Sequence, residues 1–318
     1  MLSLEKLDKN YGKYHHMCGE ALSRRAFQDL APLEPRAVRF EVRRAVEHWP
    51  GDVVIETEAD GFIIDRPEFL RDLLGRARKE GCHTEVGAAA EISRLSNGFL
   101  VRTKDGREFS AKHLVGADGW NSLVRRTLFQ GGPWLLWAEQ FVTDDAADKD
   151  AMHFFYDQRY RGGYRWEFPH VSGKRIGFTR GADEAPKYLE RHGRPIPYGY
   201  DQVVNGNACL VGDAAGQANP ITFGGIRIGM AAARMAALSL VKGNFERYAS
   251  EWPRSPFASP AYVKAFENLR GMDNRELHRS VRPFRNGYGK LSGLRAMLNG
   301  KRHRELYRAY DLGAKWGW

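Results

Sequence analysis

Alternating apolar and polar positions predict strands over much of the first two thirds of the chain. Two such runs, at 98–103 and 107–111, are separated by Lys104-Asp-Gly106, a pattern typical of a hairpin. A short apolar run at 113–118 predicts a buried strand. Further strands are expected at 52–58, 152–156, 164–168 and 175–179, and just before Gly212. The three that lie between 152 and 179 are expected to be successive strands of an antiparallel sheet.

Helical patterns accompany and follow these strands. Residues 67–79 predict a helix with Asp65 as its N-cap and Pro67 in its first turn. A run of small residues at about 227–241 predicts a second helix, and the remainder is mostly helical. This order favours an α/β nucleotide-binding fold into which an antiparallel β-sheet is inserted. The expected parts are a nucleotide-binding part at 1–128 and 208–241, a sheet at 129–207 and a helical C-terminal region at 242–318.

Composition fits a soluble globular protein, because 42% of the 318 residues are apolar and 28% are charged. No apolar run approaches the roughly 18 to 20 residues that span a bilayer, and the charged N-terminus does not resemble a secretory signal. Only three cysteines are present, at positions 18, 82 and 209. This sparse, odd number favours a reducing cytoplasm over a disulfide framework, and no Cys/His cluster has the spacing of metal ligands.

The net charge of +10 is concentrated in the C-terminal region, where residues 242–318 contain 16 Lys or Arg and 7 Asp or Glu. Solvated helix faces, nucleic acid, an acidic protein and anionic lipid are all compatible with such a region. No nucleic-acid-binding motif accompanies it. Interspersed aromatic residues favour a lipid–water boundary. These residues are Trp252, Tyr262, Phe266, Phe284, Tyr288, Tyr307, Tyr310, Trp316 and Trp318.

A first candidate for chemistry is the segment LVGADGWNSLVR at 114–125. A strand end delivers Asp118 and Gly119 into a tight turn, where glycine allows a ligand to come close. Asp118 is suited to accept a hydrogen bond from a hydroxyl, and Arg125 is suited to pair with Asp118 or with a pyrophosphate. The alternative is a turn whose carboxylate caps a helix.

The second candidate is ACLVGDAAGQANPITFGGI at 208–226, which has the pattern of a strand, a Gly212-Asp213 turn, a loop and a helix start. The turn places a carboxylate where it can bind a chain of sugar-like hydroxyls. The free backbone N–H groups of the helix start suit an electron-rich ring. Both features suit a flavin, so this segment indicates FAD chemistry.

The third candidate is YRWEFP at 164–169. In a strand, Tyr164, Trp166 and Phe168 share one face while Arg165 and Glu167 share the other. Three aromatic rings in a row form a wide apolar wall suited to a long hydrocarbon. The alternative is that this wall covers the core of the sheet.

Taken in this order, the Asp118-Gly119 and Gly212-Asp213 motifs resemble those of the flavoprotein monooxygenases and reductases that are built like aromatic hydroxylases. Within that superfamily the chain resembles the geranylgeranyl reductase family, which saturates isoprenoid chains. The segments KYHHMCGEALS at 13–23, DRPEFL at 65–70 and YRWEFP are similar to that family's Lys…Cys-Gly-Glu-Gly, Arg-x-x-Phe-Asp and Tyr-x-Trp-x-Phe-Pro. The resemblance covers roughly residues 13–241.

This resemblance implies roles for individual residues. Cys18 would lie at the reactive face of the flavin and donate a proton or gate access, and Glu20 would orient or protonate. Asp213 would bind the ribitol chain, and Arg66 would bind near the adenosine–pyrophosphate half. The aromatic residues Tyr164, Trp166 and Phe168 would contact substrate. The expected FAD-binding residues are Arg66, Asp118, Gly119, Arg125, Gly212, Asp213, Pro220, Gly224, Gly225 and Ile226.

The implied activity is FAD-dependent reduction of carbon–carbon double bonds in a polyprenyl lipid reached at a membrane surface. NADPH, ferredoxin and a deazaflavin all remain candidates for the electron donor, and the oligomeric state stays open. The rivals are a flavin-dependent monooxygenase or halogenase and a non-catalytic lipid-binding protein.

Departures from the family pattern bear on this expectation. The chain contains no Gly-x-Gly-x-x-Gly, the fingerprint that cradles the FAD pyrophosphate on a first strand–helix turn. About 30 to 40 residues of such an opening unit are expected to be lacking, so the chain is predicted to bind FAD weakly or not at all. Ala21 and Phe223 stand where the family has glycine, and only the first glycine of the Gly-x-Gly after Pro169 is kept, in Gly177-Phe-Thr179.

Overall fold

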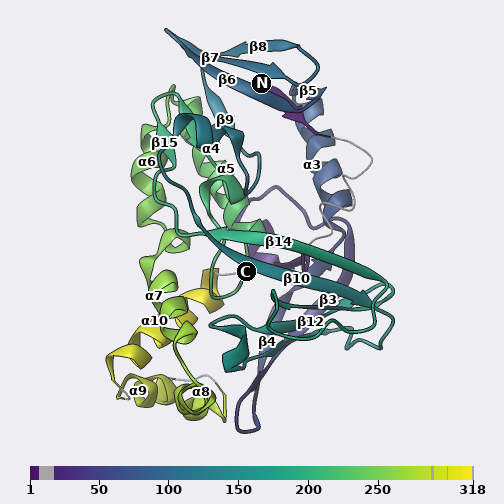
Figure 1. The fold of residues 1–318 in the computed structure, drawn as a ribbon, viewed down its shortest axis with the longest axis vertical. Coiled ribbons are helices and arrows are strands. Elements are labelled where there is room, and N and C mark those ends of the chain that lie inside the picture. Colours follow the sequence, from purple (N-terminus) through teal and green to yellow (C-terminus); the bar gives the residue numbers. More distant parts are fainter. Residues whose placement is uncertain (7–17, 288–289, 299, 317–318) are drawn as a thin grey trace.

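A computed structural model describes residues 1–6, 18–287, 290–298 and 300–316. Lys13, His15, His16, Tyr288 and Trp318 lie outside the described residues. In the described part, most of the helices form a column along one side of the molecule, and the large sheet lies at the other side (Figure 1). The mixed α/β class predicted from the sequence is confirmed.

The largest sheet has eight strands in the order β14-β10-β13-β12-β11-β3-β4-β2. Their bounds are β2 Ala21–Ser23, β3 Val38–Trp49, β4 Val53–Ile64, β10 Trp134–Thr143, β11 Ala151–Phe155, β12 Arg165–His170, β13 Gly173–Thr179 and β14 Glu190–Tyr198. The three strands expected between 152 and 179 are β11, β12 and β13, which pair antiparallel as predicted. The β3–β4 hairpin joins them through a parallel pairing of β11 with β3. The sheet therefore contains residues from 21–64 in addition to those expected at 129–207.

Three smaller sheets accompany the large one. Parallel pairing joins β1 (Leu2–Glu5) to β5 (His83–Val86), and β9 (Leu114–Gly116) to β16 (Ala208–Leu210). The short strand β15 (Val204–Asn205) lies on the other side of β16. The expected hairpin is present as β7 (Gly98–Thr103) and β8 (Glu108–Ala111), with β6 (Ala89–Leu95) beside β7.

Helix α3 (Arg66–Lys79) begins as the sequence predicts, with the Asp65 side chain accepting the Glu68 N–H and Pro67 in the first turn. Helix α5 (Ile226–Val241) follows the Gly212-Asp213 turn and packs into a core with β9 and β16. The remaining helices are α2 Arg24–Asp29, α4 Leu123–Leu128, α6 Glu246–Glu251, α7 Pro260–Arg270, α8 Asn274–Val281, α9 Lys290–Leu298 and α10 Lys301–Trp316.

Several of the C-terminal aromatic residues expected at a lipid–water boundary lie inside the protein instead. Trp252, Tyr262, Phe266 and Phe284 are all buried. Trp316 packs edge-on against Phe257 inside the helical region. The expectation that these rings face lipid is therefore wrong for the buried residues, because the helices use them to build their own core.

Candidate functional site

Two acidic turns meet at one edge of a sheet. Strands β9 and β16 run parallel with Leu210 opposite Gly116, so the chain leaves both strands at the same end. Asp118-Gly119 and Gly212-Asp213 follow directly, and both glycines have positive φ, at 79° and 63°. The carboxyl end of a parallel sheet is where α/β folds bind ligands. Both turns line the same cavity.

The carboxylate of Asp118 is engaged in holding its own turn together. It accepts hydrogen bonds from the N–H groups of Leu123, at 2.6 Å, and Val124, at 3.2 Å, and from the Ser122 hydroxyl. Leu123 and Val124 are the first residues of α4 and Ser122 is its N-cap. The Asp118 carboxylate therefore helps to cap that helix, the alternative that the sequence left open.

Arg125 ties the two turns to each other. Its guanidinium donates to the backbone oxygens of Ala214, at 2.7 Å, and Trp120, at 2.6 Å. The side chain is buried and does not line the cavity. These hydrogen bonds hold the turn after β16 against the turn after β9, so the guanidinium is not directed at a ligand.

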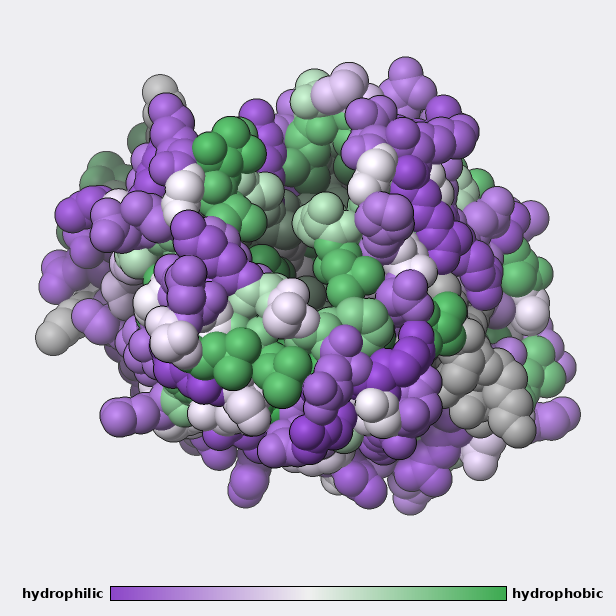
Figure 2. Space-filling view, turned by 90° about the horizontal axis from the view of Figure 1, so that it is seen from above, coloured by the Kyte–Doolittle hydropathy of each residue, from purple (hydrophilic) through white to green (hydrophobic). Residues whose placement is uncertain are grey.

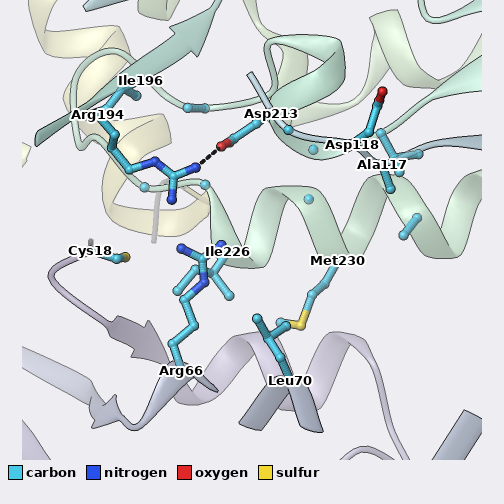
Figure 3. Close-up of a pocket in the computed structure, with 18 of the residues that line it drawn as sticks. Cys18, Arg66, Leu70, Ala117, Asp118, Arg194, Ile196, Asp213, Ile226 and Met230 are labelled. Atoms are coloured by element: carbon cyan, nitrogen blue, oxygen red, sulfur yellow. Dashed lines mark hydrogen bonds and ion pairs between the residues drawn. The ribbon is translucent and has the colours of Figure 1, made fainter. Parts of the chain in front are cut away.

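Asp213 faces the cavity instead. Its carboxylate forms an ion pair at 2.8 Å with Arg194 of β14, and both side chains line the cavity. Figure 3 shows this pair, with the Asp118 carboxylate directed elsewhere. Of the two acidic residues, Asp213 is therefore the one placed to contact a ligand.

The loop before α5 completes this side of the cavity. Asn219 organises it, since its side chain accepts the Ile221 N–H at 2.8 Å and its own N–H donates to Gly224 at 2.9 Å. Gly225 precedes α5, which has no side-chain cap, so its N-terminal N–H groups remain available for an anion or an electron-rich ring. Gly224, Gly225 and Ile226 line the cavity, whereas Pro220 is buried behind it.

The cavity has a volume of about 2230 Å³, larger than the several hundred Å³ of ordinary ligand sites. It runs from β1 and β7 to α10. Seen from above, it forms a hollow with apolar walls and a mostly hydrophilic rim (Figure 2). All the predicted site residues line it except Arg125 and Pro220. One space therefore joins the acidic turns to the predicted substrate wall.

The aromatic wall lies on the large sheet. Tyr164, Trp166 and Phe168 are buried side chains that line the cavity, while Arg165 and Glu167 pair with each other on the opposite face. The indole of Trp166 lies across its cross-strand neighbour Gly177, where a β-carbon would collide with it. The alternation predicted for this strand is confirmed. Because Gly177 has no side chain, the Trp166 indole can pack directly over the neighbouring strand.

Cys18 lies in a short segment pressed against this wall. A β-carbon at Gly19 would lie 2.7 Å from Cε2 of Phe168, so glycine permits the close approach. The Cys18 sulfur accepts the Glu20 N–H at 3.3 Å and lines the cavity. The segment therefore places a thiol beside the aromatic wall.

Glu20 anchors that segment by a buried ion pair with Arg175 of β13, in which both side chains are almost fully buried. It also accepts the backbone N–H of Arg66 at 3.3 Å. Glu20 adopts a φ of 60°, which is uncommon for a residue other than glycine. Because its carboxylate is paired with a cation, Glu20 is better suited to position Cys18 than to supply a proton.

Two further residues supply charge inside the cavity. Arg66 extends from the start of α3 toward Ile226 (Figure 3), and in the described parts of the chain its guanidinium has no carboxylate partner. Glu5 lies at the carboxyl end of β1, and burial raises the pKa of its carboxyl group. Doubly wound folds place an acidic residue on the ribose of a dinucleotide at such a strand end.

Phe223 fills the space between the loop and the wall. Its ring stacks on Tyr164 with centroids 4.6 Å apart, and Tyr164 donates its hydroxyl hydrogen to the Thr222 carbonyl. Phe223 has a φ of 54°, a costly conformation for a bulky side chain. The phenylalanine that stands where the family has glycine therefore fills this part of the cavity with an aromatic ring.

Three residues of the site were missed in the sequence: Arg194, Arg175 and Glu5. Arg194 has no sequence signal, because its partner Asp213 lies on another element. Arg175 directly precedes the apolar run of β13 and shares its burial, and a charged residue buried in this way signals an ion pair. Glu5 is the last residue of a short strand, which was a usable signal.

Comparisons with known proteins agree with this geometry. No family model matches the chain. The chain is 27% identical over 312 residues to digeranylgeranylglycerophospholipid reductase 2 of Methanopyrus kandleri, an alignment that spans 82% of this chain and 78% of that one. The sequence resemblance to geranylgeranyl reductases is thus confirmed.

Solved structures show the same fold. A geranylgeranyl bacteriochlorophyll reductase-like protein of Thermoplasma acidophilum superimposes with a TM-score of 0.73 at 18% identity, covering 93% of this chain and 89% of that chain. The flavin-dependent brominase Bmp2 superimposes with a TM-score of 0.69 at 15% identity, covering 100% of this chain and 89% of that chain. The fold is that of flavin-dependent oxidoreductases.

Proposed function

We propose that this chain, a relative of digeranylgeranylglycerophospholipid reductases, is an FAD-dependent reductase that saturates carbon–carbon double bonds of polyprenyl lipids. One observation carries the proposal. A single cavity joins the turn that carries Asp213, the start of α5, a wall of three aromatic rings and the Cys18 thiol.

The residues of the cavity fit FAD. Asp213 offers a carboxylate to the ribitol hydroxyls, and the uncapped start of α5 offers N–H groups to the ring. The guanidinium of Arg66, which lacks a carboxylate partner in the described residues, suits a phosphate. When bound, reduced FAD would supply the electron pair for the reduction.

The opposite side of the cavity fits an isoprenoid chain. The rings of Tyr164, Trp166 and Phe168 offer an apolar surface along which a hydrocarbon can lie. Cys18 is the proton source that we propose for the second carbon of the double bond, because its thiol lines the cavity beside this wall. Glu20 and Arg175 hold the Cys18 segment in place.

Two rivals remain to be distinguished. The likeness to a flavin-dependent brominase favours a monooxygenase or halogenase as the second candidate, since that fold hosts oxygen chemistry as well. A lipid-binding protein without turnover is the third.

Anaerobic turnover separates these functions. The purified chain is incubated under argon with excess reduced FAD and a digeranylgeranyl lipid, and the products are analysed by mass spectrometry. A reductase adds a pair of hydrogens to each double bond without oxygen. Products that form only in air and contain oxygen or halogen would support the second candidate, and an unchanged lipid would support the third.

The proposed substrate also implies a place of action. No helix among the described residues is both long and apolar enough to cross a bilayer. We propose peripheral contact with the cytoplasmic face of the membrane, from which a lipid chain reaches the cavity. NADPH, ferredoxin or a deazaflavin would then recharge the flavin.

A further inference from the structure

Helix α9 exposes an apolar face. Leu291, Leu294 and Leu298 are 75%, 53% and 79% exposed, and their spacing of three and four residues places them on one side of the helix. Figure 1 places α9 at the end of the helical region, on the outside of the molecule. Three adjacent leucines in water are unusual for a short helix unless another surface covers them.

Exposed cations surround this face. Arg295 lies on α9 itself, four residues after Leu291 and three before Leu298, so it flanks the leucines. Arg282 and Arg285 come from the turn that packs against α9. All three are exposed, and in the described parts of the chain none has a carboxylate partner. Basic residues beside an apolar helix face are the pattern of a helix that lies in an anionic membrane surface.

The inner side of α9 covers one end of the cavity. A β-carbon at Gly293 would collide with the Tyr307 hydroxyl, so helix and ring are in close contact. Tyr307 stacks on Phe284 with centroids 6.0 Å apart and planes 5° from parallel, and both rings line the cavity. Helix α9 therefore lies between the outside of the molecule and the far end of the cavity.

We propose that α9 docks the protein on an anionic bilayer, with Leu291, Leu294 and Leu298 among the acyl chains and the arginines at the lipid phosphates. Docking there sets the end of the cavity lined by Phe284 and Tyr307 against the membrane. A polyprenyl chain then has a short path to the aromatic wall. The purpose of the docking rests on the proposed lipid substrate, but the docking itself does not.

Vesicle sedimentation tests the proposal. The full chain is mixed with vesicles of phosphatidylcholine alone or with phosphatidylglycerol added. We expect binding to the anionic vesicles that weakens as salt is raised. The variant L291Q/L294Q/L298Q should lose about 100-fold or more in partitioning, because each leucine contributes through its buried apolar area. The matched control V171Q/L189Q changes residues that are 68% and 58% exposed elsewhere and should bind as the wild type does.

A second variant, R282Q/R285Q/R295Q, keeps the leucines and should lose binding to anionic vesicles only. Circular dichroism shows whether the leucine variant is folded. If it is not, the arginine variant still tests the proposal. Wild-type protein that fails to bind anionic vesicles would overturn the proposal, and so would leucine and arginine variants that bind like the wild type.

Activity on detergent-dispersed lipid separates this proposal from the proposed function. If the leucine variant reduces dispersed lipid but not lipid in vesicles, both proposals stand. If the wild type binds vesicles through α9 but reduces neither, the docking stands and the reductase assignment fails.

Discussion

The two sides of the cavity are built by different means. On the turn side, Asp118 is held by contacts within six residues of itself and follows a regular strand end. On the wall side, Glu20 reaches Arg175 and Phe223 reaches Tyr164 across long stretches of chain. The comparison teaches that a local motif can fix a turn, whereas the shape of the wall side depends on pairs of residues that only the folded chain brings together.

The largest effect is expected from breaking the buried ion pair on the wall side. Glu20→Gln should lower the free energy of unfolding by about 3–5 kcal/mol, because it leaves the Arg175 charge buried without a partner. Urea unfolding followed by circular dichroism measures the change. The control Glu139→Gln removes a carboxylate that pairs with the exposed Arg180 and Arg191 and should cost less than about 1 kcal/mol. Equal costs for both variants would contradict the account.

A smaller effect is expected on the turn side, where the two acidic residues should differ. Asp118→Ala removes the acceptor for two N–H groups and a hydroxyl and should cost about 1–3 kcal/mol. Asp213→Ala breaks a partly buried ion pair, in which the Arg194 and Asp213 side chains are 13% and 29% exposed, and should cost less, about 1 kcal/mol. Thermal unfolding of both variants checks this. Equal destabilisation would mean that Asp213 is as structural as Asp118.

Phe223 connects the two sides, and its replacement should change selectivity more than stability. Phe223→Gly relieves a positive φ worth about 1–2 kcal/mol but loses ring contacts of similar size. The space that it opens beside Tyr164 should raise the rate for ring-bearing prenyl substrates relative to linear ones. Competition assays with Phe223→Leu as the control measure the ratio. An unchanged ratio would remove Phe223 from substrate selection.

The smallest effect is a difference in thiol reactivity. Cys18 is half-buried in the cavity, whereas Cys209 is fully buried and burial raises the pKa of its thiol to about 12. A maleimide should therefore label Cys18 first in the native protein, and a saturated isoprenoid lipid should slow that labelling. Peptide mass spectrometry locates the adduct. Labelling of Cys209 before Cys18 would contradict the assigned cavity.

These contrasts explain how much the sequence could predict. The strands and turns that lead to Asp118 and Asp213, the cap of α3 and the alternation from Tyr164 to Phe168 follow from local patterns, and all are present. The capping role of Asp118 was an open alternative, because one motif serves either a ligand or a helix end. Arg194 could not be assigned, since its partner lies on a distant element. Trp252, Tyr262, Phe266 and Phe284 were misassigned because the composition of an amphipathic region does not distinguish a membrane face from a helical core.

Binding of FAD to the wild-type chain and to Asp213→Ala tests the central claim most directly. The account predicts saturable quenching of flavin fluorescence by the wild type, because Asp213 and the start of α5 line one cavity. It also predicts binding at least about ten-fold weaker in Asp213→Ala, because a charge-assisted hydrogen bond to the ribitol is lost. Equal affinity in the two proteins, or no saturable binding by the wild type, would contradict a flavin site at this turn.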